Sequence, residues 1–307
     1  MTADLPLMAA YSDDSEYNLR SAHFIARAEK LFLLPKATLS AWWLDGLMLI
    51  KRARAWVAQH RISAVIFTVF CAATIAALMP YDRMLLKSLR QCAVGSHFEL
   101  LNRAAIELSF WGDFLGFNMM VFVGLGLTAR LRKSLFFRRL LIAAVLGSVL
   151  SGGLANVSRT LTGRSRPSEK SEIGFHGPSL SANRHSFPSA HSATTFGASV
   201  PVAVALPPVG IPMLIISSGV AWSRMQNNRH HPSDVFASVV LSISFGVPLG
   251  LVVRRMRRAE LQVRRMRITT SVQLDLAPLN PSTTIRVISG NAPHCVSTSA
   301  VRSLAGK

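Results

Sequence analysis

Three short polar segments interrupt a largely apolar chain, and their residue types are those that handle phosphate groups. The segments are residues 159–167, 188–191 and 223–234. They supply arginines, histidines and a carboxylate. A guanidinium group binds a tetrahedral oxyanion through a planar, charge-assisted fork. An imidazole acts as nucleophile or acid near neutral pH. These residues therefore indicate phosphoryl transfer.

The spacing within the segments resembles the three motifs of the type-2 phosphatidic acid phosphatase superfamily, which read Lys-x6-Arg-Pro, Pro-Ser-Gly-His and Ser-Arg-x5-His-x3-Asp. The third motif is matched at every defined position, from Ser223 to Asp234. The second is matched except at Ala190, where the family has glycine, and the first has Arg159 in place of lysine. The resemblance covers residues 60–255, about two thirds of the chain.

The resemblance implies a role for each motif residue. His230 is expected to attack phosphorus and form a phosphohistidine, while Asp234 orients the ring and stabilises its positive charge. His191 is expected to protonate the leaving oxygen. The phosphate is expected to lie in a cradle of arginines, a serine and one backbone N–H, contributed by Arg159, Arg166, Arg224, Ser189 and Ala190.

The local sequence is compatible with these roles. Pro232 suits the first position of a helix, which places Asp234 at the third position, where a carboxylate is favoured and can reach back towards the cap. His230 comes just before that cap, so a contact between the two side chains requires only local structure. Pro188 precedes another apolar segment, and the free N–H groups at the start of its helix can face a phosphate.

Other polar residues near the motifs match no motif position. We expect Arg164 and Arg184 to extend from helix ends towards lipid headgroups. Asp113 lies near the start of an apolar segment and is expected to cap a helix. His185 and His231 adjoin motif residues, and we assign them no role.

The composition is that of a membrane protein. Half of the 307 residues are hydrophobic and the mean hydropathy is +0.33, which is too apolar for a typical soluble domain. A net charge of +19 could indicate nucleic-acid binding. The basic residues flank apolar segments, however, as the positive-inside rule predicts. Nucleic acid is therefore excluded as a partner, and membrane lipids are expected.

Six apolar segments predict an all-α, polytopic membrane protein with a core bundle of six transmembrane helices. Basic clusters before the first segment, at 129–139 and after the last segment would then share one face, the cytoplasmic one. The three motifs would lie at the opposite face, which in a bacterium is the periplasmic side of the inner membrane. The predicted segments are 62–80, 109–128, 139–157, 190–207, 209–223 and 235–253.

The chain is accordingly divided into three parts. Residues 1–60 are predicted to form a cytoplasmic segment with an interfacial amphipathic helix. Residues 61–255 form the phosphatase core, and 256–307 a basic and then disordered cytoplasmic tail. Acidic residues before position 17 predict that no signal peptide is cleaved. The three cysteines are widely separated and show neither a disulfide framework nor metal-ligand spacing.

The expected substrate is a lipid phosphate or pyrophosphate, because the site would open at the level of the headgroups. Isoprenyl pyrophosphate, phosphatidylglycerol phosphate, phosphatidate and lipid A phosphate all fit. No metal or other cofactor is expected, since arginines supply the positive charge and no acidic cluster is present. Three alternatives remain: a phosphotransferase with the same phosphohistidine, a catalytically silent lipid-binding homologue, and a vanadate-binding site like that of haloperoxidases, whose soluble fold suits the chain less well.

Overall fold

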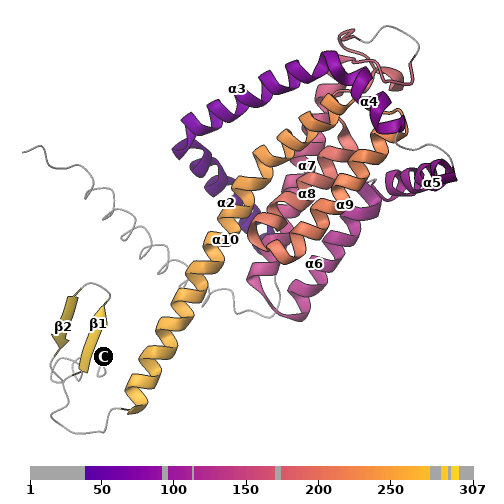
Figure 1. Cartoon of the computed structure of the whole chain (residues 1–307). Helices are drawn as coiled ribbons and strands as arrows, with labels where there is room; N and C mark the ends of the chain where they lie inside the picture. Colours follow the sequence, from indigo (N-terminus) through magenta and orange to yellow (C-terminus); the bar gives the residue numbers. More distant parts are fainter. Residues whose placement is uncertain are drawn as a thin grey trace, which may run out of the picture. The chain divides into compact units, whose positions relative to one another are not determined.

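The structure describes residues 39–91, 96–112, 114–169, 174–276, 285–289 and 292–296 in a computed structural model. Most of these residues are helical, as predicted (Figure 1). Two predictions concern residues that the structure does not describe. The capping role of Asp113 and the amphipathic segment before residue 39 lie outside the described residues.

The chain divides into a compact unit, Ala28–Arg257, and a second unit that includes Arg258–Lys307. The first unit contains the start of α10 (Pro232–Leu276) and all the helices that precede it. These are α2 (Leu39–Gln59), α3 (Arg61–Leu78), α4 (Asp82–Gln91), α5 (Ser96–Trp111), α6 (Met119–Leu131), α7 (Leu135–Thr162), α8 (Ala190–Ala205) and α9 (Pro207–Gln226). Short helical turns lie at Met79–Tyr81, Phe114–Asn118 and Ala182–Arg184.

The second unit holds the end of α10 and one strand pair. Helix α10 continues to Leu276. Strands β1 (Ile285–Ser289) and β2 (Ala292–Val296) pair antiparallel, with Ile285 opposite Val296. We predicted a basic and then disordered tail over residues 256–307. The described parts of that range contain the end of α10 and the two strands. The division of the chain at residues 60 and 255 stays a prediction.

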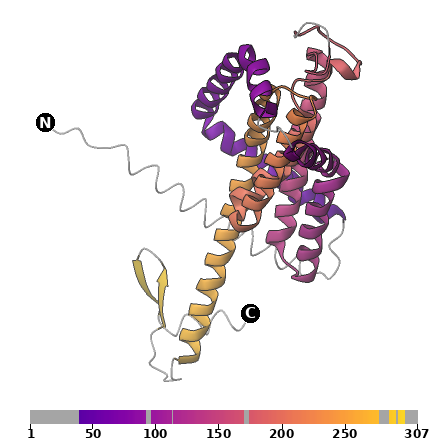
Figure 2. The same cartoon turned by 45° about the vertical axis from the view of Figure 1, so that its right-hand side comes forward.

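Helix α8 is the central helix of the first unit. Twelve of its 16 residues are buried, so it is enclosed on nearly all sides. Figures 1 and 2 both show it packed among α7, α9 and α10. Small residues permit this close packing, as is common in membrane bundles. A Cβ added to Gly147 of α7 would lie 2.2 Å from the carbonyl oxygen of Gly197 of α8.

Buried hydroxyl groups add hydrogen bonds between these helices. Ser242 of α10 donates to the carbonyl of Ala193 of α8 at 3.0 Å. The hydroxyls of Ser199 and Ser217 join α8 to α9 at 2.8 Å. Such interhelical bonds satisfy polar groups where no water is available. They also fix how the ends of α8, α9 and α10 lie against each other, and those ends carry the second and third motifs.

The outer surfaces of the helices are apolar, as an integral membrane protein requires. Large apolar side chains are exposed on α3, α6 and α9, including Ile66, Phe70, Met120, Val123, Ile211 and Ile215. Exposed apolar surface of this extent is unfavourable in water and favourable in lipid.

In the described part of the chain, three helical stretches are long and apolar enough to cross a membrane: Arg61–Arg90, Leu135–Thr162 and Pro232–Met266. The bent pair Glu99–Trp111 and Gly116–Leu131 adds a fourth if it forms one span. The predicted count of six spans is therefore not confirmed. Helix α8 falls short because it has only 16 residues, whereas a span needs roughly 20.

An ion pair attaches α2 to the core. Asp45 of α2 is buried, and its Oδ2 accepts a 2.8 Å hydrogen bond from Nε of Arg138 in α7. Arg139 lies 3.7 Å from the other carboxylate oxygen. Asp45 thus neutralises part of the basic cluster at the start of α7.

Candidate active site

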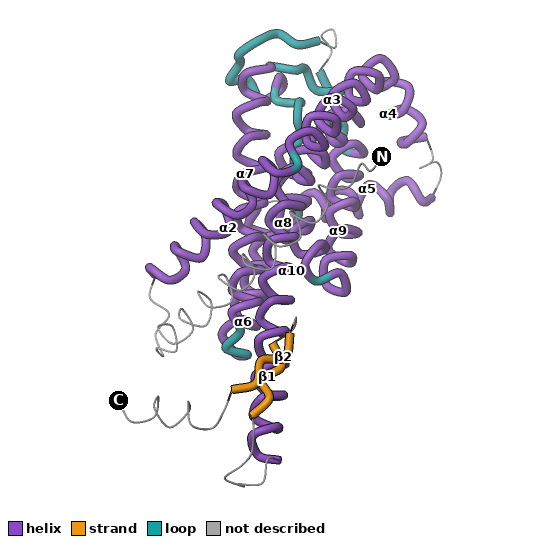
Figure 3. Tube along the Cα trace, turned by 90° about the vertical axis from the view of Figure 1, so that its left-hand side faces the viewer, coloured by secondary structure: helices purple, strands orange, loops and turns teal. Residues whose placement is uncertain are grey.

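The motif segments meet at one end of the helix bundle. Helices α7 and α9 end there, while α8 and α10 begin there, because successive helices run antiparallel. The long connection from α7 to α8 lies at the same end (Figure 3). The Ser189 backbone N–H donates to the Asp234 carbonyl at 3.3 Å, which joins the second motif directly to the third.

One arginine of the first motif, Arg166, and one of the third, Arg224, lie near His230. Burial lowers the pKa of His230 well below its usual value, and the positive charge of Arg224 lowers it further. Arg166 and His191 act on it in the same direction. Burial also lowers the pKa of Arg166, with added repulsion from Arg229 and Arg159. The predicted residues thus form one cationic cluster.

Two of these arginines have donors without a partner in the part of the chain that the structure describes. Within the described residues, the buried Nε atoms of Arg159 and Arg166 have no hydrogen-bond partner. Buried donors are normally paired, and like charges held close together repel. A bound tetrahedral anion would satisfy these donors and offset the repulsion. The cluster has the features of a phosphate site.

His230 is buried, with 1% of its side chain exposed, and its orientation is defined by a backbone group. Its Nδ1 lies 2.7 Å from the carbonyl oxygen of Ser186. A carbonyl can only accept, so Nδ1 carries the proton and Nε2 keeps its lone pair. The lowered pKa keeps the ring neutral near pH 7, which is the nucleophilic form.

The predicted contact between Asp234 and His230 is longer than we expected. Asp234 Oδ2 lies 4.0 Å from Nδ1 of His230, so the acceptor nearest to the ring is the Ser186 carbonyl. Asp234 accepts hydrogen bonds from the Ser186 hydroxyl at 2.6 Å and from the His231 backbone N–H at 2.8 Å. The second bond is the predicted reach of a third-position carboxylate back to the cap.

Arg164 does not extend towards lipid headgroups, so that prediction is wrong. Only 2% of its side chain is exposed. Its Nη1 donates to Asp234 at 2.5 Å, and its Nη2 donates to Asp82 at 2.7 Å. The rings of Phe175 and Phe187 lie 5.3 and 5.9 Å from the guanidinium carbon. Two buried carboxylates and two aromatic rings hold the charge inside, where only a paired charge is stable.

Asp82, the first residue of α4, is a further member that the sequence did not indicate. Its side chain is 1% exposed. Its Oδ1 accepts from the Ser233 backbone N–H at 2.9 Å, and its Oδ2 accepts from the Ser233 hydroxyl at 2.6 Å. Asp82 thus satisfies donors at the start of α10 that would otherwise be orphaned. It matches no motif, and no local pattern places it beside Ser233.

The alanine in the second motif causes no backbone strain. Among the described residues, Lys133 and Asn228 are the non-glycine positions with positive φ, and Ala190 is not one of them. Ala190 is the first residue of α8, and Ser189 before it is extended, with φ −73° and ψ 110°. The methyl group therefore replaces glycine without a conformational penalty.

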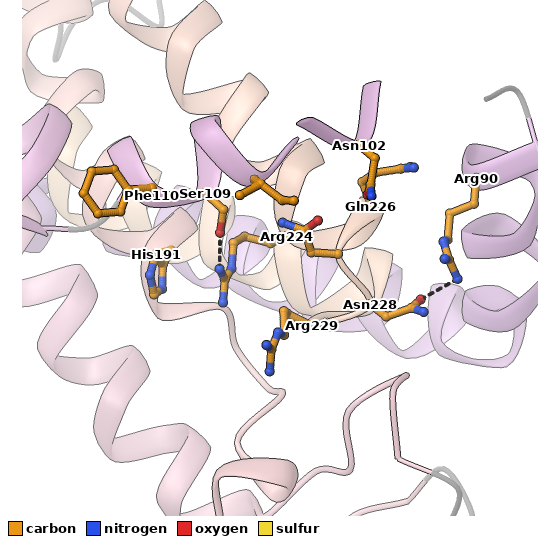
Figure 4. A pocket seen from close by; sticks show the side chains of 11 residues that line it. Arg90, Asn102, Ser109, Phe110, His191, Arg224, Gln226, Asn228 and Arg229 are labelled. Atoms are coloured by element: carbon orange, nitrogen blue, oxygen red, sulfur yellow. Dashed lines mark hydrogen bonds between the residues drawn. The ribbon is translucent and has the colours of Figure 1, made fainter. Parts of the chain in front are cut away.

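A cavity of about 660 Å³ adjoins His191 and Arg224 (Figure 4). The Nη1 of Arg224 donates to the Ser109 hydroxyl on its wall. Arg159, Arg166 and His230 do not line it, so the cavity lies beside the arginine cluster rather than within it. Its lining residues are Arg90, Asn102, Ile106, Ser109, Phe110, His191, Arg224, Gln226, Asn227, Asn228 and Arg229.

The chain shows similarity to two solved structures and to one family model. A crystal structure of a transmembrane PAP2 type phosphatidylglycerolphosphate phosphatase from Bacillus subtilis aligns with 19% identity and a TM-score of 0.45, covering 63% of this chain and 95% of that one. The crystal structure of Aquifex aeolicus LpxE aligns with 16% identity and a TM-score of 0.40, covering 57% and 94%. A search of curated proteins gives no match. The model of the PAP2 superfamily matches residues 139–258, which contain all three motifs, and this confirms the family resemblance over that segment.

Proposed function

We propose that this protein is an integral membrane phosphatase that hydrolyses a lipid phosphate or pyrophosphate through a phosphohistidine. One observation carries the proposal: a neutral, buried His230 whose Nδ1 proton is held by the Ser186 carbonyl, among arginines with unsatisfied donors. The ring presents a lone pair at Nε2, and the arginines supply the charge that a phosphate requires.

In the first step, the arginines hold the phosphate and Nε2 of His230 attacks phosphorus. The bond between phosphorus and the ester oxygen breaks, and His191 gives its proton to that oxygen. The imidazole becomes cationic, and the Asp234 carboxylate 4.0 Å away stabilises this charge. In the second step, water attacks phosphorus and His191 takes its proton. The bond between phosphorus and Nε2 breaks, inorganic phosphate leaves, and His230 returns to its neutral form.

The same arrangement supports activity without a metal. Guanidinium groups stabilise the charge of the transferring phosphoryl group, as a metal ion does elsewhere. The buried carboxylates of the site, Asp82 and Asp234, are both bound to Arg164 and are not available as metal ligands.

We further propose that the active site faces the periplasm of a bacterial inner membrane. Helix α7 has 28 residues and spans about 42 Å at 1.5 Å per residue, so its two ends lie on opposite sides of a bilayer. Basic residues cluster at its start, and Arg159 lies near its end. The positive-inside rule assigns the basic end to the cytoplasm. In this arrangement α8 and α9 also cross the membrane, which gives a core of six.

A phosphotransferase is the alternative that one feature favours. The cavity beside His191 offers about 660 Å³ in which an acceptor hydroxyl could replace water. Product analysis separates the two reactions: hydrolysis releases inorganic phosphate without an acceptor, whereas transfer requires one. A silent lipid-binding homologue would release no phosphate under either condition.

The test is phosphate release by the purified protein in detergent from a panel of lipid phosphates, with EDTA present throughout. We expect turnover by the wild type and none by His230→Ala, and a quenched reaction should contain acid-labile phosphate on His230. His185→Ala is the matched control, because that ring bonds to the Ser179 carbonyl outside the cluster. Label on a serine or aspartate, or full activity of His230→Ala, would refute the mechanism.

A further inference from the structure

The cavity beside His191 contains more positive charge than one phosphate group requires. The arginine cluster beside His230 already includes Arg166 and Arg224, and Arg159 lies near Arg166. The cavity adds Arg90 from α4 and Arg229 from the connection between α9 and α10. No acidic side chain among the described residues lines it, so these charges face space rather than a carboxylate.

Arg90 is held in position by one hydrogen bond and keeps N–H donors that can bind a ligand. Its Nη1 donates to the amide oxygen of Asn228 at 2.9 Å. Its Nε is buried and has no partner within the described part of the chain. Asn228 has a φ of 52°, a left-handed conformation that asparagine adopts more readily than most residues. A guanidinium that is anchored at one nitrogen and unsatisfied at another is suited to bind an anion.

The rest of the lining indicates the form of that anion. Polar groups of Asn102, Ser109 and Gln226 line the cavity with Arg90, while Phe110 adds an apolar surface. In Figure 4, His191 and Arg90 lie at opposite ends of the lined region. His191 is the proposed acid for the leaving oxygen. The leaving group would therefore extend from His191 towards Arg90, past groups that bind oxygen atoms.

We propose that this cavity binds a second phosphate group carried by the leaving group of the substrate, an inference that rests on the proposed function. The preferred substrates are then lipid phosphates whose leaving group keeps a phosphate after hydrolysis, either as the monophosphate that remains from a diphosphate or as a phosphodiester. Phosphatidate is a poorer substrate, because its leaving group, diacylglycerol, is neutral. The bond that breaks is still the one between the terminal phosphorus and the leaving oxygen.

The experiment compares matched substrates that differ in the second phosphate: farnesyl phosphate with farnesyl diphosphate, and phosphatidate with phosphatidylglycerol phosphate of the same chains. We expect kcat/KM of the wild type to be higher for the second member of each pair. The ratio to follow is kcat/KM for the substrate with the second phosphate divided by kcat/KM for the substrate without it. In Arg90→Gln this ratio should fall about 10- to 100-fold, the usual effect of losing a hydrogen bond to a charged group. Arg90→Lys should keep part of it.

Arg103→Gln is the matched control, because Arg103 lies on α5 with its side chain 81% exposed and pairs with Glu99. In Arg103→Gln, the ratio of the two kcat/KM values within each substrate pair should equal that of the wild type. If Arg90→Gln folds poorly, Asn228→Gly gives a second test. It keeps the left-handed backbone, removes the partner of Arg90 and should also lower the ratio.

Three outcomes decide the inference. Equal efficiencies within both pairs, or an unchanged ratio in Arg90→Gln and Asn228→Gly, would overturn it while leaving the phosphatase function intact. No phosphate release from any member would refute the proposed function instead. A soluble diphosphate such as ADP distinguishes the sources. Turnover that depends on Arg90 to the same degree would support a second-phosphate site that does not require a lipid tail.

Discussion

Arg164 donates a 2.5 Å hydrogen bond to Asp234 from a position that is almost completely buried. Through its other terminal nitrogen it also binds Asp82, so one guanidinium neutralises two buried carboxylates. Asp234 in turn lies beside His230, the proposed nucleophile. Arg164 therefore connects the start of α4 to the start of α10, where the third motif lies.

Replacing Arg164 should destabilise the fold. Arg164→Ala leaves the carboxylates of Asp82 and Asp234 unpaired, and breaking a buried ion pair typically costs about 3–5 kcal/mol. We expect a lower thermal midpoint in detergent and a large loss of activity. Arg164→Ala combined with Asp82→Asn should lose less stability than the two single changes together, since the residues share one network. Arg184→Ala, at an exposed position, is the control. A wild-type midpoint for Arg164→Ala would contradict the network.

Substitutions of Arg159 test the motif position at which this chain has arginine and the family has lysine. If it binds the phosphate, Arg159→Lys should retain substantial activity because the charge remains. Arg159→Ala should lose about 10²–10³ in kcat/KM, as when an oxyanion-stabilising donor is removed. The measurement uses one short-chain lipid phosphate. Near-normal efficiency of Arg159→Ala would mean that Arg166 and Arg224 hold the phosphate without it.

Two histidines should make the protein sensitive to acid. Burial lowers the pKa of His231 from 6.5 to about 4, with a further contribution from Arg164, and the pKa of His230 is also lowered. Below about pH 6.5 the unfolded chain binds protons that the folded chain does not, so stability is complete above that pH and declines towards pH 4. Thermal midpoints should follow this course between pH 7.5 and 4.5. His231→Gln should flatten the curve, with His185→Gln as control, and an unchanged curve would argue against the assignment.

Membrane orientation can be tested by thiol labelling. With Cys92 removed as background, a cysteine introduced by Ser168→Cys should react with an impermeant reagent added outside intact cells or spheroplasts, because Ser168 lies in the loop at the active-site end. A cysteine introduced by Ser134→Cys, beside the basic cluster, should not react. Labelling of only the second variant would place the site in the cytoplasm.

The convergence of the motifs could be predicted from the sequence, because successive spans cross a membrane in alternate directions and bring alternate ends together. The contact between Asp234 and the backbone of His231 could also be predicted from the sequence, since it depends only on the capping pattern at the start of a helix. The predicted segments near α3, α7, α8, α9 and α10 are all helical. These features depend on local spacing and apolar periodicity.

The partners of Arg164 could not be predicted in this way. Asp82 lies 82 residues before Arg164 and belongs to a polar segment without a motif. Its position follows from how α4 packs on the start of α10, which no local pattern specifies. The predicted number of spans stays unconfirmed for a related reason. A helix such as α8 is buried by its neighbours, so it can remain short and rich in serine and threonine.

The acceptor that orients His230 is a main-chain oxygen, and this affects how the site can change during evolution. No substitution at position 186 removes that oxygen, whereas loss of the Ser186 hydroxyl would affect only its bond to Asp234. The orientation of His230, the proposed nucleophile, therefore does not depend on which side chain occupies position 186. Sequences that vary at this position should retain the same ring tautomer, and a conserved serine here would reflect selection on the carboxylate.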